Sequence, residues 1–165
     1  MTKQEVQQRV LQNGKPLSLD KFEWDEKTKT FSSDEGDLVL DFVEISGCTF
    51  VTGGGCTFKT WSDCTFKTGS DCTFDTGDRC TFNTGSECTF NTGSSCTFKT
   101  GEKCVVIRRD VYEVIELTEG KKIRLNEYGV KGYKVLVKKP KKVVLTMDEI
   151  AEKFGVDVKN LKIKK

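Results

Sequence analysis

Histidine is absent from this chain of 165 residues, and its absence limits the chemistry that the protein can perform. Serine triads and two-histidine metal sites need imidazole groups, and a cysteine nucleophile ordinarily needs a histidine base. The CxxC pairs of zinc sites are missing as well. We therefore expect a protein that is not an enzyme, with no catalytic residues, no bound metal and no cofactor.

Long apolar runs are missing too. No run approaches the roughly eighteen residues of a membrane-spanning helix, and no secretory apolar segment follows Met1. These absences predict an intracellular protein that contacts no membrane and is not exported by a signal of its own. Its eight cysteines would then stay reduced, which argues against a disulfide framework.

The eight cysteines recur every eight residues in the pattern C-T-F-x-T-G-x-x, and this repeat organises the chain. A fixed period of this kind predicts a solenoid. Stacked thiolates could hold Cu(I) or zinc, but thiols buried between phenylalanines keep their protons, so we favour a stacked core. The core ladder comprises Cys48, Cys56, Cys64, Cys72, Cys80, Cys88, Cys96, Cys104, Phe50, Phe58, Phe66, Phe74, Phe82, Phe90 and Phe98.

Side chains alternate along each C-T-F-x-T segment, so the cysteine, the phenylalanine and the second threonine share the inner face. The following G-x-x has turn composition, and we expect its glycine to take a positive φ. One octapeptide cannot enclose a phenylalanine. We therefore predict an all-β-dominated parallel β-solenoid with two sheets and two octapeptide repeats per coil; three repeats per coil is the alternative. The inner threonine hydroxyls would bond to one another or to the turn backbone.

Segments flanking the repeat predict small α/β caps at both ends. Residues 1–37 form an N-terminal cap: a capping box of Thr2 and Glu5 starts a helix that continues through Leu11, and a hairpin follows. Residues 38–116 form the solenoid. In its opening rung, Leu40 takes the cysteine position and Phe42 the phenylalanine position.

Beyond Cys104, the same alignment places Tyr112 and Val114 on the next rung of the solenoid. Residues 117–165 form a basic C-terminal β cap whose terminal helix starts at a second capping box, Thr146 with Glu149. This helix is also similar to the first helix of a helix-turn-helix, but no typical recognition helix follows. Residues 104–165 carry 16 basic and 9 acidic side chains, whereas residues 1–47 carry 6 and 10.

Five residues outside the ladder are candidate contacts. Trp61 stands where the other repeats have a turn glycine, and it either contacts a partner or folds back onto the N-terminal cap. A lysine-rich stretch between the C-terminal strands and the helix is the second candidate. Its basic side chains are Lys138, Lys139, Lys141 and Lys142.

The hexapeptide Cys64–Gly69 and its copies, with the lead-in Phe22–Phe31, cover about two-thirds of the chain. In these residues the chain resembles a group of phage and prophage proteins that carry CTF-x-TG octapeptide repeats. The resemblance implies a phage origin and a place in the host cytoplasm or the virion; it transfers no catalytic residues.

We expect a non-enzymatic structural or protein-interaction element whose partner is a second copy of itself or a host or virion protein, with end-to-end self-association into a homo-oligomer as one form. One alternative is an anti-defence inhibitor that binds or sequesters a host factor or a nucleotide signal. Another is a nucleic-acid binder that uses the basic C-terminal region.

Overall fold

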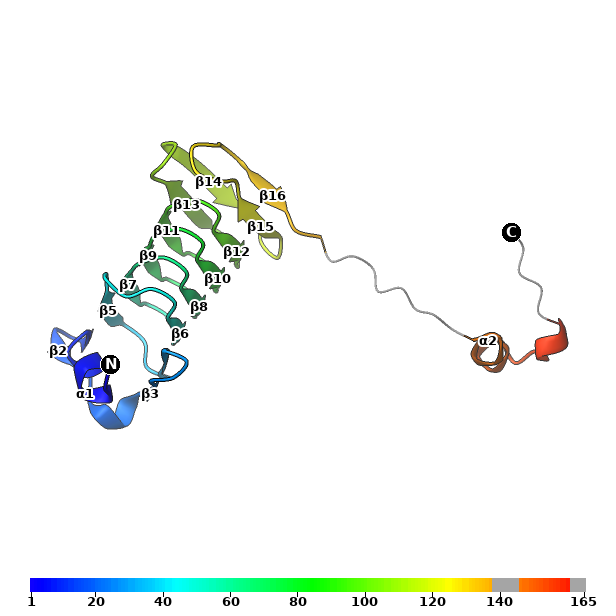
Figure 1. Cartoon of the computed structure of the whole chain (residues 1–165), viewed down its shortest axis with the longest axis horizontal. Helices are drawn as coiled ribbons and strands as arrows, with labels where there is room; N and C mark the ends of the chain where they lie inside the picture. The colour runs from blue at the N-terminus through cyan, green and yellow to red at the C-terminus, as the bar shows by residue number, and fades with distance from the viewer. Residues whose placement is uncertain (138–145, 161–165) are drawn as a thin grey trace.

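The computed structural model describes residues 1–137 and 146–160, and Figure 1 shows a stack of short strands. Two eight-stranded sheets contain all described strands. One sheet contains β1 (Val10–Gln12), β2 (Lys15–Pro16), β5 (Leu38–Phe42), β7 (Thr57–Thr60), β9 (Thr73–Asp75), β11 (Thr89–Thr92), β13 (Cys104–Arg108) and β14 (Glu113–Leu117). The other contains β3 (Glu23–Asp25), β4 (Thr30–Ser32), β6 (Thr49–Val51), β8 (Thr65–Lys67), β10 (Thr81–Asn83), β12 (Thr97–Lys99), β15 (Lys122–Leu125) and β16 (Tyr133–Val135).

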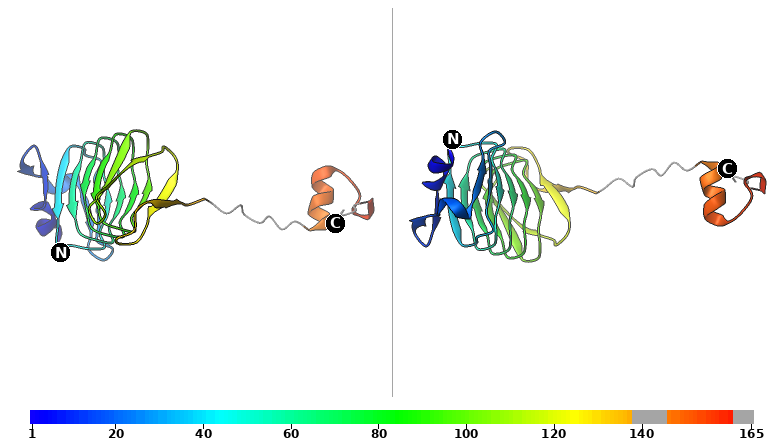
Figure 2. Two further views of the ribbon diagram at one scale, coloured as in Figure 1. Left: turned by 90° about the horizontal axis from the view of Figure 1, so that it is seen from above. Right: turned by 90° about the horizontal axis from the view of Figure 1, so that it is seen from below.

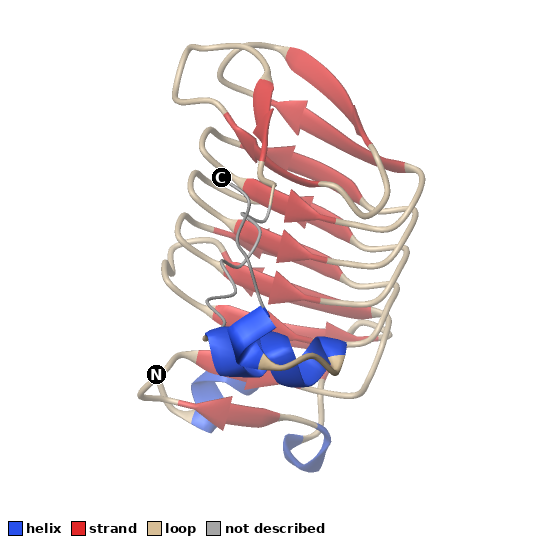
Figure 3. Ribbon diagram, turned by 90° about the vertical axis from the view of Figure 1, so that its right-hand side faces the viewer, coloured by secondary structure: helices blue, strands red, loops and turns tan. Residues whose placement is uncertain are grey.

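The central strands form a parallel β-solenoid with two repeats per coil, as the sequence predicted. Phe50 pairs with Phe66 in one sheet and Phe58 with Phe74 in the other, so successive coils are offset by 16 residues. The alternative of three repeats per coil is wrong, because it would bring residues 24 apart into register. Figures 2 and 3 show the coils stacked along one axis with turns at both corners.

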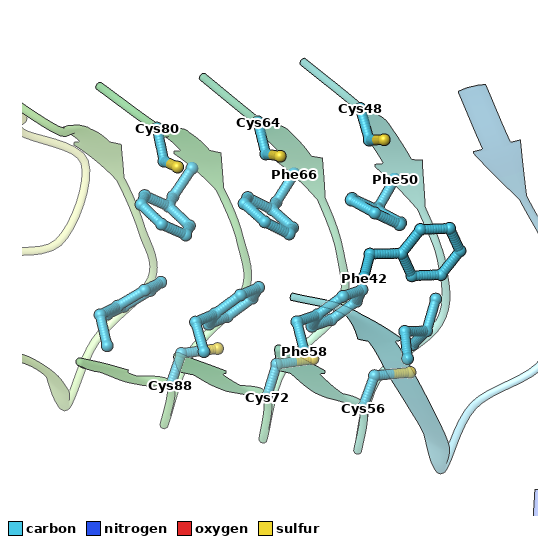
Figure 4. Close-up of a cluster of buried hydrophobic side chains, with 14 of the residues drawn as sticks. Phe42, Cys48, Phe50, Cys56, Phe58, Cys64, Phe66, Cys72, Cys80 and Cys88 are labelled. Carbon is cyan, nitrogen blue, oxygen red and sulfur yellow. The ribbon is translucent and has the colours of Figure 1, made fainter. Parts of the chain in front are cut away.

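The core consists of the predicted cysteine and phenylalanine ladders, and every ladder residue is buried. Rings within one file stack almost in parallel: the centroids of Phe58 and Phe74 are 4.9 Å apart at an interplanar angle of 3°. Rings of opposite files meet edge to face, as between Phe74 and Phe82 at 5.2 Å and 75°. Figure 4 shows this arrangement with the sulfurs flanking the rings. Both geometries are favourable for aromatic quadrupoles, which explains why one repeated ring can fill the whole core.

The inner threonine hydroxyls donate hydrogen bonds to carbonyls of the turn backbone. Of the two predicted partners, other threonines or the turn backbone, the structure shows the second. Thr68 Oγ1, for example, donates to the carbonyl of Gly69 at 3.3 Å, and Thr92 Oγ1 donates to that of Gly93 at 3.2 Å. Only Thr76 Oγ1 lacks a partner among the buried side-chain oxygens and nitrogens of the described residues.

The turn glycines do not adopt the positive φ that we expected of them. That conformation falls two residues later, directly before each cysteine, where Asp71 has φ 59° and Ser95 has φ 58°. The glycine is needed because successive coils approach closely: a Cβ on Gly69 would lie 2.7 Å from the backbone nitrogen of Gly54. Where successive coils approach this closely, the sixth position of the repeat therefore requires a residue without a side chain, and the eighth position accepts non-glycine residues at a positive φ.

The first helix is shorter than predicted. Helix α1 (Lys3–Gln7) has the expected capping box of Thr2 and Glu5, but Val10–Gln12 forms β1 and pairs antiparallel with β5. Asn13 and Gly14 form the hairpin turn to β2 with φ values of 51° and 75°. Pairing with an open sheet edge outweighs the weak helical preference of this short segment.

The opening rung is also out of phase with the prediction. Leu40 pairs with Phe58 and Phe42 with Thr60, so Leu40 takes the phenylalanine position and not the cysteine position. The connection from Phe42 to Cys48 is two residues longer than the equivalent connection from Thr60 to Cys64, which shifts the alignment. Parallel pairing starts earlier still, because β4, which lies within residues 1–37, pairs with β6.

The C-terminal end reverses direction where a further rung was expected. Tyr112 lies in a turn with φ 50°, and β14 returns antiparallel to β13 with Ile115 opposite Val106. Tyr112 and Val114 are therefore exposed, not buried as the alignment required. The predicted strands β15 and β16 continue the other sheet, also antiparallel.

Three short helices complete the described chain. The 3₁₀ turn η1 (Leu19–Lys21) lies in the N-terminal cap. Helix α2 (Met147–Phe154) starts at the predicted capping box of Thr146 and Glu149, ends at Gly155 in the left-handed conformation, and contacts the 3₁₀ turn η2 (Val158–Asn160). Within the described residues, no helix has the length and apolar character needed to cross a membrane.

Candidate functional site

The cysteine ladder is a packing element with satisfied thiols. From Cys56 to Cys104 each thiol donates to a carbonyl, mostly of a turn, as Cys72 Sγ does to Ser70 at 3.4 Å. Burial raises the pKa of Cys104, and hydrogen bonding to neighbouring cysteine thiols together with burial raises that of Cys80. In residues 1–137 and 146–160, no group of three potential ligands converges to hold a metal ion.

The two corners of the solenoid differ in the column of sixth positions. At one corner this column is entirely glycine, at positions 53, 69, 85 and 101. At the other corner, which follows β7, β9, β11 and β13, the column reads Trp61, Gly77, Gly93 and Arg109. The two glycines leave a recess between the two large side chains, and a cavity of about 360 Å³ is centred there.

Trp61 fits into a glycine position because the coil before it is irregular. A Cβ on Gly77 would overlap Ser62, whereas the corresponding neighbour of Trp61 belongs to the longer connection between Phe42 and Cys48. The Trp61 side chain is 57% exposed and stays outside the buried core. Trp61 is therefore not packed into the core beside the N-terminal cap, and its contact with a partner stays a prediction.

Arg109 closes the other end of the recess and reaches back across the coils. Its Nη1 donates to Asp75 Oδ1 at 2.7 Å, and its Nη2 donates to the carbonyl of Thr76. Asp78, on the same lining, accepts from the backbone nitrogen of Ser94 at 2.6 Å. Asp110 and Tyr128 complete the wall on the C-terminal side.

Arg108 connects the C-terminal loop, residues 126–132, to the end of the core by hydrogen bonds. It pairs with Thr92 in register, so it occupies the inner threonine position, and its side chain is fully buried. Its guanidinium donates to both carboxylate oxygens of Asp110 and, at 2.6 Å, to the carbonyl of Val130. A planar fork of donors satisfies several acceptors at once, which suits arginine to this closure.

The strand β16 is an unpaired edge of its sheet in the part of the chain that the structure describes. Its inward-facing residues, Tyr133 and Val135, are 44% and 50% exposed because nothing described packs over them. The outer face of β12, β15 and β16, the last three strands of this sheet, carries only basic charges. These side chains are Lys99, Lys122, Arg124 and Lys134.

Sequence reasoning found part of this site. Trp61 stood out as a broken repeat position, whereas Arg109, Asp78 and Lys134 were missed. Arg109 has the same signal as Trp61, a large residue at the sixth position, and its offset of 48 residues, a whole number of coils, puts both at one corner. The four lysines between 138 and 142 lie outside the described residues.

Comparisons with protein-family models, with curated proteins and with solved structures give no match for this chain, so its site is interpreted from its own geometry.

Proposed function

We propose that this protein is a non-enzymatic interaction element that docks an extended acidic segment of a protein partner onto the edge strand β16. The observation that carries the proposal is this open edge, with a half-exposed apolar inner face and a wholly basic outer face. An added strand would gain main-chain hydrogen bonds from the edge and specificity from alternate side chains.

The opposite end of the solenoid differs in a way that supports the choice of β16. There, α1 packs against β1 and β3 with Val6 fully buried, and Trp24 donates to the carbonyl of Met1 at 2.7 Å. The edge strand β2 contains Pro16, which cannot donate a hydrogen bond. Natural proteins protect sheet edges by such devices. In the described part of the chain, Lys134 is the one such device on β16.

Charge favours an acidic partner over a symmetric pair of C-terminal ends. Pairing two β16 strands would place two Lys134-bearing faces side by side, and like charges across strands are destabilising. A strand that alternates acidic and apolar residues would set its carboxylates against Lys134 and Arg124 and its apolar side chains against Val135 and Tyr133. Among the edge strands of the described residues, β3 offers such a pattern in a second copy through Glu23, Trp24 and Asp25.

The proposal is tested with a fluorescent synthetic peptide that alternates Glu and Val, titrated with the full chain and followed by anisotropy. Binding is expected to weaken about fivefold in Lys134→Glu, because one charged contact contributes roughly 1 kcal/mol, and to stay unchanged in Lys59→Glu, which alters an outer-face lysine far from the edge. Equal binding of a peptide that alternates Lys and Val contradicts the proposal.

Two further outcomes would assign the same edge to other functions. Preference for duplex DNA over the acidic peptide, with affinity falling steeply as salt rises, indicates a nucleic-acid binder. A concentration-dependent increase in mass that Lys134→Glu abolishes indicates end-to-end self-association. The phage origin implied by the repeat, and a role as an inhibitor of a host factor, remain proposals that identification of the bound partner would test.

A further inference from the structure

We propose that the recess between Trp61 and Arg109, here called the corner cavity, binds a cationic side-chain group, a guanidinium or an ammonium, through Trp61 and Asp78. This site is separate from the β16 edge: it lies at the corner that follows β7 to β13, and its lining does not include β16. Its volume of about 360 Å³ is near the lower end of the range typical of small-molecule sites, roughly 300–1,000 Å³.

The aromatic wall of the cavity, Trp61, is not part of the hydrophobic core. Glycine fills the same position in the six other repeats between Cys48 and Lys103, and Trp61 is absent from the buried core and its packed neighbours. The Trp61 indole lines the cavity and is 57% exposed, so a ligand in the cavity can reach it. A cation over the face of tryptophan is attracted by the ring quadrupole, and tryptophan is the strongest of the aromatic side chains in this contact.

The charged residues that line the cavity favour a positively charged ligand. Asp75 is paired with Arg109 at 2.7 Å, and Asp110 is paired with the buried Arg108 at 2.6 Å. Asp78 lines the same cavity and forms no ion pair with any described residue; its Oδ1 accepts only from Ser94. A carboxylate that is held in place by a backbone N–H and lacks a countercharge is suited to a cation.

The same charged side chains disfavour an anionic ligand. The one arginine that borders the cavity already donates to Asp75 and to the Thr76 carbonyl, so a phosphate or carboxylate would meet three aspartates and an occupied guanidinium. Tyr128, which is 77% exposed on the C-terminal wall, adds a second aromatic surface against which the stem of an arginine or lysine can pack.

The test follows the indole N–H signals of the whole chain by ¹H–¹⁵N NMR during titration with arginine amide. The chain has two tryptophans, so Trp61→Gly assigns the signals, and it also restores the repeat residue and should keep the fold. We expect the Trp61 signal to shift with millimolar affinity and the Trp24 signal to stay. Affinity should fall at least fivefold in Asp78→Asn, which preserves the acceptor for Ser94.

The matched control is Glu102→Gln, because Glu102 holds the same repeat position at the opposite corner. It should leave the titration unchanged. The proposal is overturned if arginine amide causes no shift of the Trp61 signal, if Asp78→Asn binds as tightly as the parent chain, or if sodium acetate or adenosine monophosphate produces the same shift as arginine amide. None of these outcomes depends on whether the β16 edge binds a peptide.

Discussion

At the residue scale, each central phenylalanine contacts four other rings, two in its own file and two across the core. Phe74 stacks on Phe58 and Phe90 at 4.9 Å and meets Phe66 and Phe82 edge to face. Neighbouring backbones are fixed by the sheet, so a vacancy in the file cannot close by relaxation of the coils. The ladder should therefore be sensitive to truncation of a single ring.

We predict that Phe74→Ala lowers the free energy of unfolding by about 3–5 kcal/mol, the range for truncation of a buried aromatic side chain. Urea denaturation followed by circular dichroism measures the loss. Thr73→Ala changes the neighbouring exposed side chain and is expected to change stability by less than about 0.5 kcal/mol. Equal losses in both variants would show that the rings do not form the core.

Adding a side chain at the sixth repeat position and removing one at the eighth are expected to have opposite effects on stability. Gly69→Ala places a Cβ 2.7 Å from the Gly54 nitrogen and should cost about 1–3 kcal/mol by overpacking. Ser95→Gly removes a side chain at φ 58° and should be neutral or stabilising by up to about 1 kcal/mol. Thermal unfolding of both variants gives the comparison; a stable Gly69→Ala protein would mean that the coils can separate locally.

At the element scale, Arg108 at the end of the last parallel strand, β13, forms a buried ion pair with Asp110 and donates to carbonyls of the C-terminal loop, residues 126–132. Arg108→Met leaves Asp110 buried without its countercharge, and we predict a loss of about 3–5 kcal/mol. Arg109→Met is the neighbouring control, because its pair with Asp75 is half exposed and should contribute no more than about 1 kcal/mol. Hydrogen exchange of residues 126–132 should accelerate in the first variant alone.

The cysteine ladder should be chemically silent while the solenoid is folded. All eight thiols are at most 1% exposed, so a thiol-directed reagent such as Ellman's reagent should label none of them in native buffer and all of them in guanidinium. We also expect sub-stoichiometric zinc and copper in the purified protein. Rapid labelling of any thiol under native conditions, or one equivalent of metal, would give the ladder a chemical role.

At the scale of the whole molecule, the two corners share one backbone geometry, so each octapeptide adds half a coil. Deleting residues 80–87 should leave a folded protein whose C-terminal end is rotated by half a coil, which moves Arg109 to the corner opposite Trp61. Deleting residues 80–95 keeps both at one corner but removes a full coil. Because stacked repeats contribute to stability in proportion to their number, the longer deletion should have the lower melting temperature.

Circular dichroism and thermal unfolding of the two deletion variants test this symmetry. If the 8-residue deletion unfolds and the 16-residue deletion does not, the two corners are not interchangeable. Titration with arginine amide adds a second readout, because the shorter deletion should weaken binding at the corner cavity by removing its C-terminal wall.

The sequence alone determined the repeat unit of this protein. Alternation within C-T-F-x-T is a local property, so it identified the buried faces from Cys48 to Cys104, and the capping boxes at Thr2 and Thr146 identified both helix starts. What only the tertiary structure decided depends on how distant segments meet. The two-residue-longer connection after Phe42 sets the phase of the opening rung, and the reversal at Tyr112 ends the stack. The repeat offset of 48 residues already aligns Trp61 with Arg109, whereas the C-terminal wall of Asp110 and Tyr128 follows from the reversal of the chain and not from any local pattern.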